Sequence, residues 1–151
     1  MKRLSSAIAD NDQVLDIIAA FTLYQNQNFT AITILNIASL SDLFSIVIYY
    51  AALKSNQISL VEAHGTGTPV KDPAEYDSVR KVFGGPIRKD TLSLDSVKGL
   101  FGYIESASRI VALIKRFLII MQGAIPLQAS SKPLIRPLTP CPLITSRLLR
   151  N

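Results

Sequence analysis

The sequence predicts an α/β fold in which helices cover the faces of a mostly parallel sheet. Short apolar runs of strand length alternate along the chain with longer segments whose apolar residues recur at helical spacing. A strand, helix, strand order needs crossover connections, and these bring successive strands parallel to one another. The 151 residues, 48% of them hydrophobic, are enough for one domain with a real core.

In the first third of the chain the patterns predict one strand and one helix. The run Val14 to Tyr24 is almost continuously apolar and fits either a buried strand or a buried helix. The polar residues 25–28 that follow it favour the strand. A helix is expected from Ser39, because Ser39 and Asp42 have the spacing of a capping box and the apolar residues of Leu43 to Ala51 share one face.

In the middle of the chain the residue patterns predict a strand, a tight turn and a helix with clear start and stop signals. Ile58 to Val61 is an apolar run of strand length, and a turn rich in Gly and Thr follows it at His64. The next helix is expected to have Asp72 as its N-cap and Pro73 at its first helical position, and to end at Gly84. His64 is therefore expected at the end of a strand.

The last elements are a strand, a long helix and a tail. Leu92 to Val97 is predicted to form a strand, and a helix is expected from about Ile104 to Gln122, with Gly123 as its terminator. Four prolines lie within ten positions of the segment that follows, which excludes a regular helix or an interior strand there. We expect residues 131–151 to form an extended, poorly ordered tail.

The composition excludes several classes of protein. Cys141 is the single cysteine, so no disulfide framework is possible and the chain needs no oxidising compartment, which favours a cytoplasmic location. The longest apolar stretches, Leu43 to Leu53 and Ile110 to Met121, fall short of the ~20 residues that a membrane span needs. Because residues 1–12 contain no apolar core, we expect no secretory signal.

The net charge of +5 belongs to the C-terminal part of the chain. Residues 1–105 carry 9 basic and 11 acidic side chains, whereas residues 106–151 carry 7 basic ones and no acidic one. Such asymmetry can indicate an anionic partner such as nucleic acid or a lipid surface. A solvated tail is favoured here, because no aromatic residues alternate with the charges. No nucleic-acid or membrane partner is therefore expected.

Two glycine-flanked loops, each after a predicted strand, form the candidate site, since ligands usually bind at that edge of an α/β sheet. In the first, His64 stands beside two glycines and beside the hydroxyls of Thr66 and Thr68, which can hydrogen-bond a ligand. A lone His is more often structural than catalytic. The loop lacks the Lys-Ser/Thr of a nucleotide-binding loop. No metal site is expected, because one His and one distant Cys give no ligand spacing.

The two loops lie within longer motifs that identify a family. VEAHGTGTPVKDPAEYDSVRKVF, followed by LSLDSVKGLFGYIESASRIVALIK, resembles the C-terminal half of a β-ketoacyl synthase domain, most closely those of fungal iterative polyketide synthases. The resemblance runs from about Ser5 to Ser130. It implies that residues 1–130 are half of a thiolase-like α/β/α/β/α fold, and that residues 131–151 are a separate basic tail rich in proline.

The resemblance also implies a chemistry. In the family, a nucleophilic Cys on the first half of the domain accepts an acyl group from an acyl carrier protein, and two His assist decarboxylation of a malonyl thioester and carbon–carbon bond formation. His64 matches the first His, Thr66 and Thr68 match hydroxyls that contact the phosphopantetheine arm, and Lys98 matches a Lys that orders the site. No bound cofactor is implied, because the phosphopantetheine arrives on the carrier protein.

The chain departs from the family at the second His and at the nucleophile. Tyr103 stands at the position of the second His, and a phenol with a pKa near 10 cannot replace imidazole in acid–base work. Cys141 lies between two prolines in the tail and has no strand-to-helix turn around it, so it is not expected to be the nucleophile. Further departures replace small or special residues of the family: Lys71, Asp95, Arg109 and Leu127.

Three hypotheses about function follow. The leading one is a truncated, diverged ketosynthase that does not catalyse condensation alone. The alternative is a non-catalytic partner that docks in trans onto another synthase half or subunit through apolar surface such as Leu43 to Tyr50. The third and least favoured is a basic tail that binds nucleic acid or anionic lipid.

Overall fold

A small parallel sheet organises the chain. The computed structural model describes residues 1–23, 36–86 and 88–126, together with the backbone of 144–146. Strands β1 (Leu60–Glu62), β2 (Leu92–Asp95) and β3 (Ile144–Ser146) are parallel and lie in the order β1-β2-β3. The predicted α/β class with a mostly parallel sheet is confirmed.

Helices α2 (Ile37–Tyr50) and α3 (Lys71–Phe83) pack against one face of the sheet. The core between them consists of Tyr76, Val79 and Phe83 from α3 and Leu92 and Leu94 from β2. The ring of Phe44 on α2 meets that of Phe83 edge to face at 5.5 Å between centroids. Each such buried side chain contributes about 1.5–3 kcal/mol, so this layer accounts for much of the stability of the described fold.

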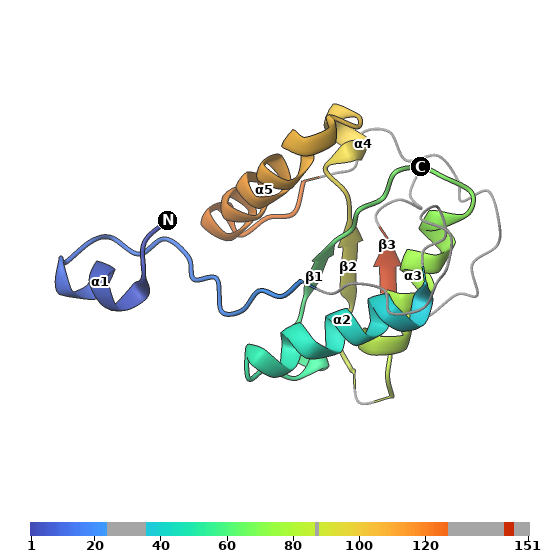
Figure 1. The fold of residues 1–151 in the computed structure, drawn as a ribbon, viewed down its shortest axis with the longest axis horizontal. Helices are drawn as coiled ribbons and strands as arrows, with labels where there is room; N and C mark the ends of the chain where they lie inside the picture. Colours follow the sequence, from blue (N-terminus) through green and yellow to red (C-terminus); the bar gives the residue numbers. More distant parts are fainter. Residues whose placement is uncertain (24–35, 87, 127–143, 147–151) are drawn as a thin grey trace.

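Helix α5 (Ser108–Gln122) lies on the opposite side of the strands from α2 and α3 (Figure 1). Two short helical segments, α4 (Lys98–Phe101) and a 3₁₀ turn at Glu105–Ala107, connect β2 to α5. Near the start of the chain, α1 (Leu4–Ala9) stands at the far end of an extended segment, away from the sheet (Figure 1). None of the helices described is both long enough and apolar enough to cross a bilayer.

One of the predictions for the first third of the chain is wrong. Over residues 14–23 the backbone forms neither strand nor helix, and the side chains are exposed, Phe21 by 84% and Leu23 by 94%. No strand of the described chain pairs with this segment, so the apolar pattern does not produce a strand here. Tyr24 lies outside the described residues. At Leu43 to Tyr50, Phe44 and Ile48 pack against the core, whereas Tyr49 and Tyr50 are 79% and 63% exposed. The docking surface expected there stays a prediction.

The starts of helices α2 and α5 and of strand β1 differ from their predicted positions. Helix α2 begins at Ile37, because the side chain of Asn36 accepts hydrogen bonds from the N–H groups of Ala38 (2.9 Å) and Ser39 (3.2 Å). Helix α5 begins at Ser108 instead of near Ile104. The first paired strand covers Leu60–Glu62, two residues later at its start than predicted. The left-handed terminator Gly123 of α5 is confirmed, with φ of +64°.

Arg88 links three segments of the chain through hydrogen bonds to their backbone carbonyls. Its buried guanidinium donates to the carbonyls of Phe83 at the end of α3 (2.8 Å) and of Ile58 before β1 (2.8 Å), and also to the carbonyl of Ser55. One residue after Ile58, the carbonyl of Ser59 accepts from the N–H of Ser93 (2.9 Å), which begins the pairing between the β1 and β2 segments.

The tail contributes one element that the sequence did not predict. Residues Ile144–Ser146 form the edge strand β3, paired with Leu92 to Leu94 of β2. The expectation that residues 131–151 form a poorly ordered tail stays a prediction. An edge position tolerates a neighbouring proline-rich segment. Cys141 and the tail's Lys132, Arg136, Arg147 and Arg150 lie outside the described residues, so the hypothesis that the tail binds an anionic partner stays a prediction.

Candidate functional site

His64 lies two residues after the end of β1, at the carboxyl end of the sheet where the sequence places it. The next residue, Gly65, has φ of +45°, and a Cβ built on it would lie 2.8 Å from both Cβ and Oγ of Ser96, which follows β2. Only glycine allows this approach. The loops after β1 and β2 are therefore in contact at Gly65 and Ser96.

Two carboxylates of α3 hold the His64 loop from the other side. Glu75 accepts hydrogen bonds from the N–H groups of His64 (2.6 Å) and Gly65 (2.9 Å). Asp72 accepts from the N–H groups of Gly67 (3.0 Å) and Thr68 (3.3 Å). The prediction of Asp72 as the N-cap is wrong, because α3 begins at Lys71 and the carboxylate binds loop amides instead.

The two threonines of the loop lie side by side. Their Oγ1 atoms are 3.4 Å apart, both side chains are half-buried, and the N–H of Lys71 donates to Oγ1 of Thr68 (3.3 Å). Thr66 and Thr68 thus present hydroxyls from one short stretch of the carboxyl edge.

Lys98 and Tyr103 come from the segment after β2, and Tyr103 lies between the other two: its ring contacts His64 and is approached by Lys98. The rings of His64 and Tyr103 are edge to face, with 6.1 Å between centroids and 88° between planes. Nζ of Lys98 lies 5.7 Å from the centroid of the Tyr103 ring. The side chain of Tyr103 is 60% exposed. The structure therefore places His64 near two residues that the sequence also singled out, Lys98 and Tyr103, which lie 34 and 39 positions later in the chain.

The surroundings of His64 favour its neutral form. Partial burial lowers the pKa of the imidazole below its ordinary value of 6.5, and the ammonium groups of Lys98 and Lys71 lower it further. The carboxylates of Glu75 and Asp72 act in the opposite direction. At neutral pH the imidazole is uncharged and can donate one hydrogen bond or accept one.

The sequence that carries this edge of the sheet matches a known family. Residues 17–132 match the family described as the C-terminal domain of beta-ketoacyl synthases. The chain belongs to this β-ketoacyl synthase family. It is 64% identical over 130 residues to the citrinin polyketide synthase of Monascus ruber, and 65% identical over 130 residues to the clavatol synthase of Penicillium crustosum. These stretches cover 86% of this chain and 5% of each synthase, so the chain spans a small part of those relatives.

Solved ketosynthases show the same fold. A ketosynthase domain from the oxazolomycin system of Streptomyces albus superimposes with a TM-score of 0.85 at 25% identity, over 97% of this chain and 26% of that one. The ketosynthase from module 6 of the bacillaene synthase of Bacillus subtilis gives 0.85 at 26% identity, over 96% and 26%. The thiolase-like fold and the resemblance to polyketide ketosynthases are confirmed.

Sequence reasoning missed three polar residues beside the candidate site. Ser96 contacts Gly65, and Glu62 and Lys115 form a buried ion pair behind the loops, with 2.9 Å between Nζ and Oε2. A charged residue such as Lys115 within the apolar helix Ile110 to Met121 was the available signal, because a lysine among residues of a buried face needs a partner. Among the described residues there is no cluster of three or more His, Cys, Asp or Glu that could hold a metal ion.

Proposed function

We propose that this chain supplies the His64 side of a ketosynthase active site, which acts on malonyl and acyl thioesters carried by the phosphopantetheine arm of an acyl carrier protein. The observation that carries the proposal is that His64, Lys98 and Tyr103 lie together at one edge of the sheet. The rings of His64 and Tyr103 are 6.1 Å apart between centroids, and Nζ of Lys98 is 5.7 Å from the centroid of Tyr103. Membership of the ketosynthase family supports the substrate class.

In this proposal the neutral imidazole of His64 donates a hydrogen bond to the thioester carbonyl oxygen as enolate charge develops during decarboxylation. One preorganised donor of this kind lowers a barrier by about 3–4 kcal/mol. The lowered pKa of His64 keeps the imidazole neutral at pH 7. Thr66 and Thr68 hydrogen-bond the phosphopantetheine arm, and Lys98 orders the ring of Tyr103 beside His64. No cofactor other than this arm is required.

We also propose that the 151-residue chain does not catalyse condensation alone. Acyl transfer needs a nucleophile, and Cys141, in the proline-rich tail outside the described residues, does not fit that role. The phenol of Tyr103 can donate one hydrogen bond but cannot act as an acid and base near neutral pH. The nucleophilic cysteine then has to come from a polypeptide segment beyond these residues.

The test is release of carbon dioxide from malonyl carrier protein. The purified chain is expected to release no more than its His64→Ala variant. Addition of the cysteine-bearing first half of the clavatol synthase ketosynthase should restore release, and only with His64 intact. A matched Lys89→Met variant, altered at an exposed lysine, should behave as the unaltered chain. Release by the chain alone above the His64→Ala level would overturn the proposed inactivity.

A second candidate is a non-catalytic partner that docks in trans onto a synthase. The observation that favours it is exposed apolar surface at two places, residues 14–23 and one side of α5. The α5 residues recur at helical spacing and share one face: Ile110, Ile114, Leu118 and Met121. Docking without catalysis predicts a stoichiometric complex with the cysteine-bearing half whose carbon dioxide release is unaffected by His64→Ala.

A further inference from the structure

Two carboxylates lie next to each other on the sheet face opposite the core. Glu62 of β1 and Asp95 of β2 are partners in the parallel register. Their strand neighbours Val61 and Leu94 face the core formed with α2 and α3, so Glu62 and Asp95 point to the other face. Their side chains are 1% and 2% exposed. Two buried like charges at neighbouring positions are unfavourable unless a cation lies between them.

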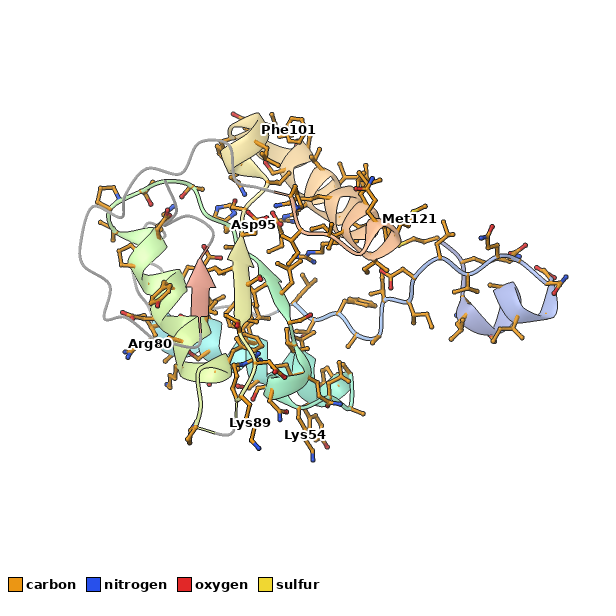
Figure 2. All side chains as sticks on the ribbon, turned by 180° about the vertical axis from the view of Figure 1, so that it is seen from behind. Lys54, Arg80, Lys89, Asp95, Phe101 and Met121 are labelled. Carbon is orange, nitrogen blue, oxygen red and sulfur yellow. The ribbon has the colours of Figure 1, made fainter. Side chains whose placement is uncertain are left out.

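Lys115 of α5 provides that cation. Its Nζ lies 2.9 Å from Oε2 of Glu62 and 2.8 Å from Oδ2 of Asp95, and its side chain is 7% exposed. Figure 2 shows Asp95 at the end of β2 beside α5, while the exposed Lys89 and Lys54 lie at the opposite end of the strands. A guanidinium nitrogen of Arg116 also donates to the backbone carbonyl of Glu62 (3.3 Å).

The other oxygens of the two carboxylates bind the loop that leads to Lys98 and Tyr103. Oε1 of Glu62 accepts from the N–H of Val97 (2.5 Å), and Oδ1 of Asp95 accepts from the N–H of Ser96 (2.8 Å). Oγ of Ser96 accepts from the N–H of Lys98 (3.3 Å), and the same Ser96 side chain contacts Gly65. A continuous set of contacts therefore connects Lys115 to both loops of the site.

We propose that Lys115 is a positioning residue, whose ammonium fixes the carboxyl ends of β1 and β2 to each other and thereby sets the distance of His64 from Lys98 and Tyr103. Lys115 does not touch His64, and it acts through Glu62, Asp95 and Ser96. The inference rests on the proposed function only in treating His64 as the reacting side chain.

The sequence offers a direct probe, because His64 is the only histidine of the chain. One imidazole therefore gives one set of resonances, and its titration and its Overhauser contact with the ring of Tyr103 can be followed by NMR in the full chain. In folded Lys115→Met we expect the Overhauser contact to weaken at least twofold. The titration midpoint should rise toward the ordinary value, because separation of the loops removes the burial and the Lys98 charge that lower it.

Controls separate positioning from general loss of stability. Lys89→Met removes an exposed lysine and should change neither readout. Val79→Ala weakens the core on the other face of the sheet and should lower stability without moving the His64 midpoint. Asp95→Asn and Glu62→Gln keep the size of the side chains and should each give a smaller change in the same direction as Lys115→Met.

The proposal is overturned if folded Lys115→Met keeps both His64 readouts. If Lys115→Met does not fold, unchanged readouts in Asp95→Asn and Glu62→Gln overturn it equally. In the unaltered chain the Lys115 ammonium should give a slowly exchanging NMR signal with contacts to both carboxylates, and its absence overturns the proposal without any variant. Because no readout uses catalysis, failure here leaves the carbon dioxide test of the proposed function unaffected.

Discussion

The ring of Tyr103 stands edge-on to the imidazole of His64, at 6.1 Å between centroids. A bulkier ring thus occupies the place at which the family resemblance implies a second imidazole. The phenol ring remains 60% exposed while it makes this contact. A phenol at this position packs as an aromatic ring, but its ordinary pKa near 10 does not suit acid–base work at neutral pH.

The charge of Lys98 is expected to control the titration of His64. Because the nearby ammonium disfavours a second positive charge, Lys98→Met should raise the pKa of His64 toward its ordinary value of 6.5. The measurement is an NMR titration of the single imidazole. Lys89→Met is the matched control, and an equal midpoint in the two variants would contradict the assignment of this effect to Lys98.

The stability of the chain should depend on pH through the same residue. With a folded-state pKa below 6.5, the unfolded chain binds a proton at His64 more readily than the folded one. The free energy of unfolding should therefore fall as the pH decreases from about 6.5 toward the folded-state pKa, and this contribution should be constant above that window. Urea denaturation at pH 7.5 and 5.5 measures it. The dependence should be weaker in His64→Gln, and an unchanged slope would refute it.

Glu75→Gln should loosen the His64 loop. The carboxylate accepts two backbone hydrogen bonds, from His64 and Gly65, and a carboxamide presents only one oxygen to the same two donors. We expect a loss of about 1.5–3 kcal/mol in the free energy of unfolding, measured by urea denaturation. Asp77→Asn, which alters an exposed carboxylate paired with Arg80 at 3.6 Å, should cost under about 1 kcal/mol. Equal losses would argue against the loop-holding role.

Gly65→Ala should destabilise the chain more than Gly67→Ala. Both glycines have positive φ, of +45° and +75°, so each substitution costs about 1–2 kcal/mol in backbone strain. Only the Cβ at position 65 also meets Ser96, at 2.8 Å, since nothing lies within 4 Å of the Cβ position at Gly67. Thermal unfolding compares the two variants. The Ser96→Gly change should recover part of the loss in Gly65→Ala and none in Gly67→Ala.

Much of this fold can be predicted from the sequence, because the spacing of apolar residues indicates which side of a helix or strand is buried. The helix over Lys71–Phe83, the strand at Leu92–Asp95 and the turn after β1 are found within two residues of their predicted positions. The strand prediction at Val14 to Tyr24 fails over its described residues, because a strand needs hydrogen-bonding neighbours as well as apolar side chains, and the described chain supplies none there.

The site was predictable as a set of residues but not as a geometry. The motifs gave His64, Thr66, Thr68, Lys98 and Tyr103, and their assigned roles stay predictions. The hydrogen bonds that support the loop could not be predicted from the sequence, because the acidic residues that form them have more than one possible partner. Asp72 and Glu75 have the spacing of helix-capping residues, and only the fold shows that their carboxylates bind loop amides instead.

The hydrogen bonds that attach residues 64–68 to α3 affect the entropy cost of ligand binding at this loop. Four backbone N–H groups of the loop are fixed by carboxylates of one helix, so loop and helix should move as a single rigid body. The conformational entropy of ordering the loop is then lost when the chain folds and not when a ligand binds. Amide hydrogen exchange should accordingly be as slow at Gly65 and Gly67 as in the first turns of α3, in contrast to a loop that closes over its substrate.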